Sequence, residues 1–520
     1  MGRNVRANAM NKALTERRAL RWRNRRIIYN DDAGVAWSET AKGDPHAILD
    51  ARFNHCRNSL VDSYFFCVGD GRDKPFGHDM PPWGDPHQLI IDASRSAGIE
   101  VFASLRMNDT HDASWQEKPE RFASYELKVK RPDLLIGERR EYPASGDPLN
   151  PQCHLGRIWS AFDYAKQEVH AHRLAFIKNI LSGYDWDGFE MDFCRFPAYF
   201  KMGEALDNVN TMTDFVRQVR ELLNQIGAER GRPYLLAVRV ADTPQLSRRL
   251  GLDVEAWMSQ DLIDIVIAGA GFNPYAAPFG EFVELGHRFD VPVYPCIDAM
   301  YLTWFARRSG RESSRPVERL RAMASNMWLE GADGIYFFNL FVPIEAGPVL
   351  GKPAEIYRVL NEVGEFVELA NLDKIYQAEC LRSSTSIYLY PCSLPHQLPA
   401  RLIDRRAIPL KIGDAVERHQ KDGSLKELLL RIRVTDLDDE ESIEAHVNAV
   451  MVDVRRSDKP SESVTHRGRS RAAAGTWFEG LVTAPPVHRG INTIEVAPGL
   501  GCLGKDATAI QDVQLRVCYE

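Results

Sequence analysis

The chain has 520 residues, of which 44% are hydrophobic and 26% charged, the balance of a soluble globular protein with a sizeable core. The net charge of −7 argues against nucleic acid as a partner, and the lack of any apolar run of about 18 residues argues against a membrane helix. Nine scattered cysteines without a CxxC pair, and an N-terminus without an apolar signal segment, lead us to expect a reduced, cytoplasmic protein.

Residues 1–25 form an arm that is rich in arginine. The basic residues of this arm and of the position after it are Arg3, Arg6, Arg17, Arg18, Arg21, Arg23, Arg25 and Arg26. A local run of this kind is usually solvated. We therefore expect a solvated N-terminal arm or helix, with contact to a polyanion as the alternative.

From residue 26 onward, short apolar runs alternate with helical patterns. The runs predict strands at 27–29, 61–68, 99–105, within 184–197, and at 234–240, 262–268, 291–297 and 334–338. Helices are predicted after Asp44-Pro45 and Asp85-Pro86, where the aspartate caps the helix and the proline takes its first position. Further helices are predicted at 159–182, 213–226, 316–329 and 353–371.

This alternation predicts a closed (β/α)8 TIM barrel over residues 26–375. An open doubly wound sheet fits the alternation too, but no GxGxxG motif follows the first strand and there is no P-loop. The segment 112–158 is too long for an ordinary connection, and loops of that length are usually functional or locally structured.

Residues 376–520 change to alternating segments separated by turn residues. Strands are predicted at 386–390, 425–434, 443–454, 476–482, 492–496 and 513–519. This pattern is typical of an antiparallel β-sandwich. The polar segment 455–475 is expected to be a mobile loop.

The fourth predicted strand carries two carboxylates. It lies in the sequence YDWDGFEMDFCRFP at positions 184–197. Because strand side chains alternate, Glu190 and Asp192 point to one face and the apolar residues around them to the other. Carboxylates that face a barrel interior lower the stability of the fold unless they are paired with cations or hydrogen-bond donors, so they are kept there mainly for such pairing or for catalysis.

Working groups in such barrels gather at the C-terminal ends of the strands. The polar residues expected there are Asn30, Asp31, Asp32, Arg106, Asn108, Asp109, His111, Glu190, Asp192, Arg195, Arg239, Asp242, Asn273, Asp298 and Asn339. Such a set suits recognition of hydroxyl groups. It also suits cleavage of an acetal, which needs two carboxyl groups on opposite sides of one bond. Aromatic residues that would stack on sugars are Trp83, Trp115, Tyr275 and Trp304.

The segment 184–197 resembles the fourth-strand motif of uncharacterised (β/α)8 glycoside hydrolase-like families, in which DGIELDxxRFP is typical. Segments 232–239 and 251–257 look like the corresponding parts of those proteins, and residues 376–520 are similar to the accessory β-domains that follow such barrels. The resemblance implies hydrolysis of glycosidic bonds without fixing the roles of individual residues.

Three better-known families differ in how well they fit this strand. The chitinase motif DxxDxDxE ends in the acid glutamate, and Cys194 stands at that place here. Alpha-amylase-type enzymes have an arginine two residues before the nucleophile, and Glu190 stands there. Alpha-galactosidase-type barrels place an aspartate nucleophile at the end of strand four, where Asp192 stands.

We therefore interpret the chain as a glycoside hydrolase that acts on an oligo- or polysaccharide without a cofactor. Asp192 is expected to be one catalytic carboxylate, nucleophile or base. Asp298 is the first choice for the partner acid, followed by Asp109 and Glu190. The residues expected to bind substrate are Asn30, Asp31, Arg106, Asn108, His111, Arg195, Arg239, Asn273 and Asn339. The arginines favour an acidic sugar, because a guanidinium matches a carboxylate or sulfate.

Other interpretations remain open on the sequence alone. Glu190 and Asp192 also fit a structural ion-pair layer with Arg106 and Arg239. The aspartates at the ends of strands one and seven also fit helix caps or turns. A catalytically silent barrel that binds carbohydrate is one alternative function. A metal-dependent lyase or hydrolase is another, and its ligands would be Asn30, Asp31, Asp109 and His111.

Overall fold

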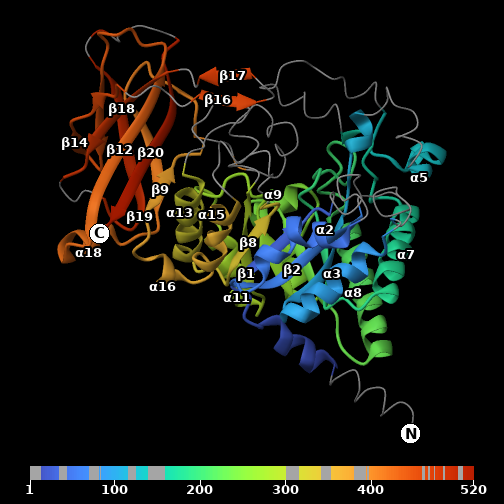
Figure 1. Cartoon of the computed structure of the whole chain (residues 1–520). Coiled ribbons are helices and arrows are strands. Elements are labelled where there is room, and N and C mark those ends of the chain that lie inside the picture. Colours follow the sequence, from blue (N-terminus) through green and yellow to red (C-terminus); the bar gives the residue numbers. More distant parts are fainter. Residues whose placement is uncertain are drawn as a thin grey trace.

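The chain folds into a closed barrel of eight parallel strands, followed by antiparallel sheets (Figure 1). The computed structural model describes residues 13–33, 44–69, 81, 83–114, 125–138, 158–299, 315–340, 353–379, 394, 397–458, 463–466, 469–472, 475–483, 487–499, 501 and 507–520. The barrel strands are β1 (Ile27–Asp31), β2 (Val61–Gly69), β3 (Glu100–Arg106), β4 (Gly188–Asp192), β5 (Leu235–Val240), β6 (Ile265–Ala268), β7 (Val293–Asp298) and β8 (Ile335–Phe338). They pair in sequence order, and β8 closes on β1, so the predicted TIM barrel is confirmed.

Helices connect the strands and cover the outside of the barrel. They are α2 (Pro45–Arg52), α3 (Pro86–Ala97), α5 (Glu126–Lys130), α7 (Gln167–Gly183), α8 (Val209–Arg230), α9 (Pro244–Arg249), α10 (Val254–Ser259), α11 (Gly280–Arg288), α13 (Pro316–Leu329), α15 (Pro353–Tyr357) and α16 (Phe366–Leu369). Both predicted Asp-Pro helix starts are confirmed, since Asp44 accepts from the His46 amide at 2.8 Å and Asp85 from the His87 amide at 2.9 Å. In the part of the chain that the structure describes, no helix has the length and apolar character needed to cross a membrane.

Two helix predictions need correction. The helix predicted at 353–371 is broken, because a 3-10 turn at Arg358–Asn361 separates α15 from α16. The helix predicted from residue 159 begins only at Gln167, after a stretch of turns.

Large apolar side chains fill the middle of the barrel. They are Ile28, Phe65, Phe102, Leu235, Ala237, Ile265, Ile267, Tyr294, Cys296, Tyr336 and Phe338. The rings of Phe65 and Phe102 stack with centroids 4.3 Å apart. A Cβ atom on Gly188 would lie 2.1 Å from the Phe102 ring, so strand four has to begin with glycine. The alternation that builds this layer places the next inward residues of each strand above it, at the C-terminal ends.

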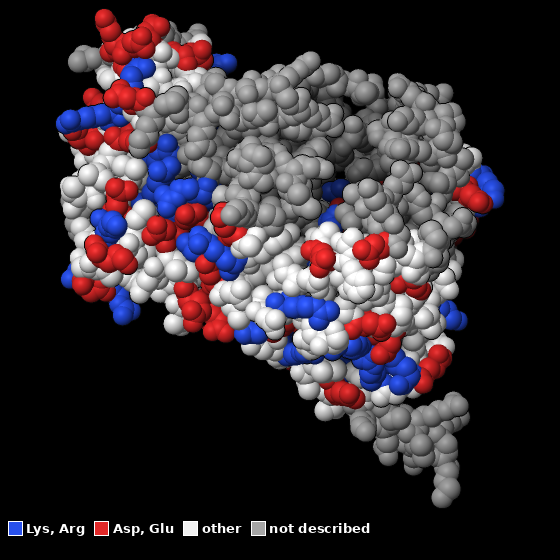
Figure 2. Space-filling model, viewed as in Figure 1, with Lys and Arg blue, Asp and Glu red and all other residues white. Residues whose placement is uncertain are grey.

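The base of the barrel is closed by the arginine-rich segment, which is helical over residues 13–21 (Figure 1). Arg25 is fully buried and forms a bidentate pair with Glu100, with nitrogen–oxygen distances of 2.7 and 2.9 Å. Arg17 and Arg21 are also buried and bind the aspartates that precede β6, including Asp264. The expectation of a solvated arm is therefore wrong for these three arginines, because barrel carboxylates neutralise them. The described surface seen in Figure 2 carries cations and anions side by side.

Two antiparallel sheets form the C-terminal part, which confirms the predicted β-sandwich. One has the order β10-β20-β12-β18-β15 with β9 on β20, and the other has the order β11-β19-β13-β14. Their strands are β9 (Lys374–Gln377), β10 (Ala400–Arg401), β11 (Arg406–Ile412), β12 (Leu425–Thr435), β13 (Ile443–Val447), β14 (Val450–Val452), β15 (Arg455–Arg456), β18 (Thr476–Leu481), β19 (Gly490–Pro498) and β20 (Ala509–Tyr519). Strand β9 crosses the predicted boundary at residues 375 and 376.

Three segments of this part differ from the prediction or fall outside the description. The strand predicted at 443–454 is a hairpin of β13 and β14, because Asn448 and Ala449 have positive φ angles of 47° and 66°. The polar segment 455–475 contains β15 and a second hairpin, β16 (Ser463–His466) with β17 (Arg469–Ala472). The strand predicted at 386–390 lies outside the described residues.

Helix α13 joins the barrel to the sheets. The Asn326 side chain donates to the carbonyls of Tyr275 and Lys411, both at 3.1 Å. A Cβ atom on Gly413 would lie 2.4 Å from the Ser325 carbonyl, so the two parts meet at backbone distance. Buried Lys374 and Asp414 form an ion pair of 3.1 Å beside this contact.

The buried pair at the barrel base gives a test of the fold. Replacement of Arg25 by alanine leaves Glu100 buried without its cation, which we expect to lower the free energy of unfolding by about 3–5 kcal/mol. Chemical denaturation followed by circular dichroism measures this loss. Arg23→Ala, an exposed change in the same segment, is the control and should alter stability by less than about 0.5 kcal/mol. Equal stabilities of the two variants would contradict the assignment.

Candidate active site

The C-terminal ends of β3, β4 and β5 bring charged residues together inside the barrel. In the strand register, Asp192 on β4 lies between Arg106 on β3 and Arg239 on β5. Glu190 lies one layer deeper, beside Ser104 and Ala237. Asp298 ends β7 on the same inward face, opposite Phe338 of β8. Each of these charged residues is at most 6% exposed.

Glu190 is completely buried and accepts hydrogen bonds from three neutral groups. The Tyr336 hydroxyl donates to Oε1 at 2.8 Å, the Asn30 side-chain amide to Oε2 at 3.4 Å, and the Ser104 hydroxyl also to Oε2. Burial, and next the charge of Asp192, raise the pKa of Glu190 to about 8. A carboxyl with this pKa is mostly protonated at neutral pH.

Asp192 faces a cation instead. Nη1 of Arg239 lies 3.3 Å from Oδ2, and the Cys194 amide donates to Oδ1 at 2.9 Å. Arg239 is itself held, because Nη2 donates to the Ala270 carbonyl at 2.8 Å and the guanidinium lies 3.9 Å from the centroid of the Phe338 ring. Arg239 was predicted to bind substrate. Its contacts in the structure hold Asp192, and the substrate-binding role stays a prediction.

A second chain of contacts runs along the rim from β3 to β8. Arg106 binds Asp109 at 2.9 Å and lies 4.0 Å from Asp32, which accepts from the Asn339 side-chain amide at 3.2 Å. Asn339 has a φ angle of 55°, and its backbone amide donates to the Asn30 carbonyl at 3.2 Å. Buried Lys128 donates to the Asp109 carbonyl at 2.8 Å. The structure thus connects Arg106, Asp109, Asp32 and Asn339 along the rim.

Arg195 follows β4 and lies among these rim charges. Burial lowers its pKa, and the positive charge of Arg106 lowers it further. The carboxylates of Asp109, Asp32 and Asp298 act in the opposite direction. Arg195 thus lies close to the guanidinium of Arg106 and to the carboxylates of Asp109, Asp32 and Asp298.

Other predicted residues turn away from the barrel interior. Asp31 points to the helix layer, where it accepts from the Tyr64 hydroxyl at 2.8 Å and lies 3.6 Å from Arg52. The Asn108 side chain bonds backbone groups, donating to the Phe162 and Ala198 carbonyls and accepting from the Phe162 amide at 2.9 Å. Both were predicted to bind substrate, and both hold neighbouring segments in place.

Asn273 also has a structural set of contacts. Its side-chain amide donates to Asp242 at 2.8 Å and to the Leu394 carbonyl at 2.9 Å. Asp242 accepts in turn from the Leu394 amide at 3.0 Å, and burial raises the pKa of this carboxyl. This pair joins the β5 and β6 ends to the segment that leads into the sheets.

The remaining predicted residues lie partly beyond the described part of the chain. Trp115 and Trp304 lie outside the described residues. His111 begins a 3-10 turn at His111–Ser114, and its side chain is not among those described. Trp83 packs against the core and Tyr275 is buried. Within the described residues, no group of three or more His, Cys, Asp or Glu side chains is arranged to hold a metal.

Three residues of the site were not predicted from the sequence. Ser104 and Tyr336 bind Glu190, and Lys128 holds the segment after β3 through Asp109 and through Asp112 at 3.1 Å. The alternation of β3 already puts Ser104 on the same face as Arg106. The contacts of Tyr336 and Lys128 join segments far apart in the sequence, which a strand pattern does not reveal.

Comparison with known proteins gives weak likenesses. No family model matches the chain, and no curated protein matches it. Among solved structures, an alpha-amylase from Geobacillus thermoleovorans complexed with acarbose is 11% identical with a TM-score of 0.39, over 91% of this chain and 98% of the amylase. A GH18 chitinase from Chromobacterium violaceum is 10% identical with a TM-score of 0.37, over 94% of this chain and 91% of the chitinase.

A third such structure is the GH36 alpha-galactosidase AgaA from Geobacillus stearothermophilus in complex with raffinose. It is 11% identical with a TM-score of 0.33, over 89% of this chain and 56% of the galactosidase. At these identities and scores, no activity is carried over from these proteins to this chain. The barrel assignment therefore depends on the pairing of its own strands.

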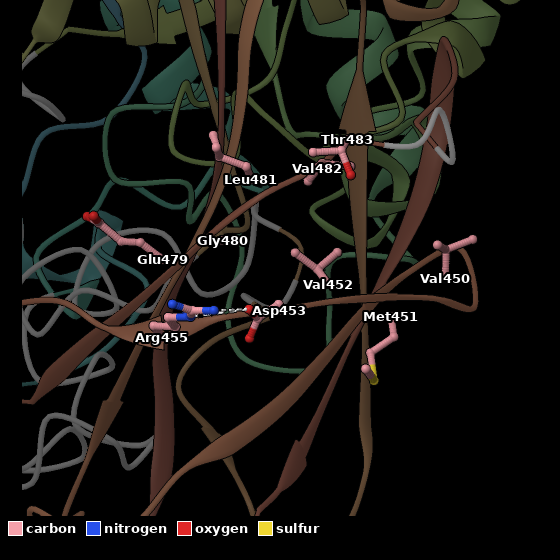
Figure 3. Close-up of a pocket in the computed structure, with 10 residues that line it drawn as sticks. All are labelled: Val450, Met451, Val452, Asp453, Arg455, Glu479, Gly480, Leu481, Val482 and Thr483. Atoms are coloured by element: carbon pink, nitrogen blue, oxygen red, sulfur yellow. Dashed lines mark hydrogen bonds and ion pairs between the residues drawn. The ribbon is translucent and has the colours of Figure 1, made fainter.

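A separate hollow of about 530 Å³ lies on the C-terminal sheets (Figure 3). It is lined by β14, by β18 and by the residues around them, including Met451, Asp453, Arg455 and Leu481. The Asp453–Arg455 ion pair of 2.8 Å is exposed. The hollow contains none of the residues predicted for the site.

The contacts of Asn108 predict a loss of stability on its removal. Asn108→Ala leaves buried backbone groups of Phe162 and Ala198 without their partner, which we expect to cost about 1–3 kcal/mol in the free energy of unfolding. Chemical denaturation provides the measurement. Asn208→Ala removes an amide whose bond to the Glu204 carbonyl lies at the surface, and this control should cost less. If Asn108→Ala were the milder change, the structural role would be wrong.

Proposed function

We propose that this chain is a glycoside hydrolase whose reaction centre is Asp192 at the end of β4. The observation that carries the proposal is the way this carboxylate is held. One guanidinium and one backbone amide fix it on the inward face of the barrel, at the end where such barrels work. A carboxylate fixed in this way suits attack on an anomeric carbon, or activation of a water molecule, without reorganisation.

Asp298 remains our first choice for the partner acid. It ends β7 on the same inward face, three strands away around the barrel. The other two candidates are less suited. Asp109 is paired with Arg106 at 2.9 Å, and Glu190 lies below Asp192 with both oxygens bonded. In this proposal Asp298 protonates the leaving oxygen while Asp192 acts on the sugar from the other side of the bond.

The rim arginines support an acidic sugar as the substrate. Arg106 lies close enough to Arg195 for its charge to lower the pKa of Arg195, and the carboxylates of Asp109, Asp32 and Asp298 lie beside them. An anionic group between two such cations relieves their repulsion and accepts bidentate hydrogen bonds. We therefore propose that a carboxylate or sulfate of the glycan binds here, while Asn339 and Asp32 contact hydroxyl groups.

The central prediction concerns Asp192. Asp192→Asn keeps the shape but removes the negative charge and the basicity, so we expect kcat to fall by on the order of 10²–10⁴-fold. Product release is measured on a panel of neutral and acidic oligosaccharides, with wild type and variant side by side. Asp439→Asn changes a fully exposed carboxylate and should leave the rate unchanged.

The outcomes separate the possible roles of the barrel. Equal rates of wild type and Asp192→Asn would refute the catalytic role of this carboxylate. Saturable glycan binding without any product, unchanged by Asp192→Asn, would instead favour a silent carbohydrate-binding barrel. Loss of activity after dialysis against a chelator would favour the metal-dependent alternative.

The acidic-sugar proposal makes its own prediction. Arg106→Ala removes one cation of the anion-binding rim, so we expect KM for acidic glycans to rise by about 10-fold or more, as for a lost charge-assisted hydrogen bond. Neutral glycans should be affected less. Calorimetry of glycan binding to wild type and Arg106→Ala compares the loss of affinity for acidic and for neutral glycans without any turnover. A loss confined to neutral glycans would show that Arg106 does not bind an anionic group.

A further inference from the structure

The two inward carboxyls of β4 differ in what surrounds them. Asp192 lies against the guanidinium of Arg239 at 3.3 Å. Glu190, two residues earlier on the same face, receives its hydrogen bonds from two hydroxyls and one amide. Glu190 is fully buried and Asp192 is 2% exposed. Two anions this close in a dry interior repel each other, and burial penalises each of them.

We propose that Glu190 is a positioning residue that remains a neutral carboxylic acid beneath Asp192, so that Asp192 is the single anion of the pair. This inference rests on the proposed function. It removes Glu190 from the candidates for direct contact with substrate and gives it an indirect role. When Glu190 is neutral, Arg239 pairs with Asp192 alone. Asp192, the nucleophile or base, is then held in place as an anion.

The hydrogen-bond partners accommodate a proton on Glu190. A hydroxyl both donates and accepts, whereas an ammonium or guanidinium only donates. With the proton on Oε2, Glu190 donates to the Ser104 oxygen while Tyr336 donates to Oε1. These contacts tie β4 to β3 and β8, and the weaker contact of Asn30 ties it to β1. The carboxyl therefore links four strands without carrying a charge.

The surrounding charges favour this state. The ionisable groups whose charges interact with Glu190 are Asp192 of β4 itself, Arg239 of β5, Cys296 of β7 and Tyr336 of β8. The pKa of Glu190 is raised to about 8, by burial first and by Asp192 second, although Arg239 and the hydroxyls oppose the shift. Above that pH, ionised Glu190 would compete with Asp192 for Arg239.

The first test detects the proton without any substrate. Infrared spectra of the folded protein at about pH 6, below the pKa of about 8, should contain a carbonyl band of a buried neutral carboxylic acid. Glu190→Gln should remove the Glu190 component of this band in the difference spectrum against wild type, and Glu229→Gln, an exposed change on α8, should leave the spectrum unchanged in this region. Tyr336→Phe keeps Glu190 and should keep the band, which covers the case in which Glu190→Gln fails to fold. Absence of the band in wild type would overturn the proposal.

The second test uses the pH profile of kcat on the substrate found in the panel. In wild type, activity should fall as pH rises past about 8, because Glu190 loses its proton. Glu190→Gln mimics the neutral form, so it should retain activity near pH 6 and lose this alkaline decline. Tyr336→Phe removes a donor to the anion and should move the decline to higher pH.

The outcomes keep the two proposals apart. A merely structural Glu190 would change stability or overall rate without moving the alkaline decline, and that result would overturn the positioning role. A Glu190→Gln variant that folds but is inactive at every pH would make Glu190 a catalytic residue and would equally overturn it. If no glycan is cleaved by wild type, the proposed function fails, and the infrared band still decides whether Glu190 is neutral.

Discussion

The contact between Arg239 and Asp192 is the interaction on which the candidate site depends. A buried guanidinium is expensive unless its hydrogens and its charge are both compensated. Arg239 meets most of this need with the carboxylate of β4, the Ala270 carbonyl after β6 and the ring of Phe338 on β8, while its buried Nε has no hydrogen-bond partner among the described residues. One side chain of β5 thereby fixes three other strands relative to one another. The orientation of Asp192 follows from that arrangement.

The fold was largely predictable because each strand and helix carries its own local signal. Eight apolar runs, the Asp-Pro helix starts and the change to alternating segments led to the barrel and the sandwich. The failures occurred where local pattern and tertiary contact disagree. Arg17, Arg21 and Arg25 form a basic run of the kind that is usually solvated, yet carboxylates from distant strands bury them. No pattern within the run indicates those partners.

The site was predictable only in part, for a related reason. Alternation correctly placed Glu190 and Asp192 on one inward face, and the barrel register brought Arg106 and Arg239 beside them. Position at a strand end did not say which way a side chain points, so Asp31 and Asn108 were given substrate roles although they bind Tyr64 and backbone groups. The sequence likewise did not show that Asp192 pairs with a cation, Arg239, whereas Glu190 accepts hydrogen bonds from neutral groups.

The close approach of Gly188 to Phe102 has an evolutionary consequence. The aromatic ring of strand three occupies the space that a side chain at the start of strand four would fill. The two positions therefore share one volume, and neither is free to change alone. Among homologues we expect a covarying pair, in which a residue larger than glycine at position 188 accompanies a smaller one at position 102. The glycine of this motif thus records the packing of the neighbouring strand rather than a demand of the chemistry above it.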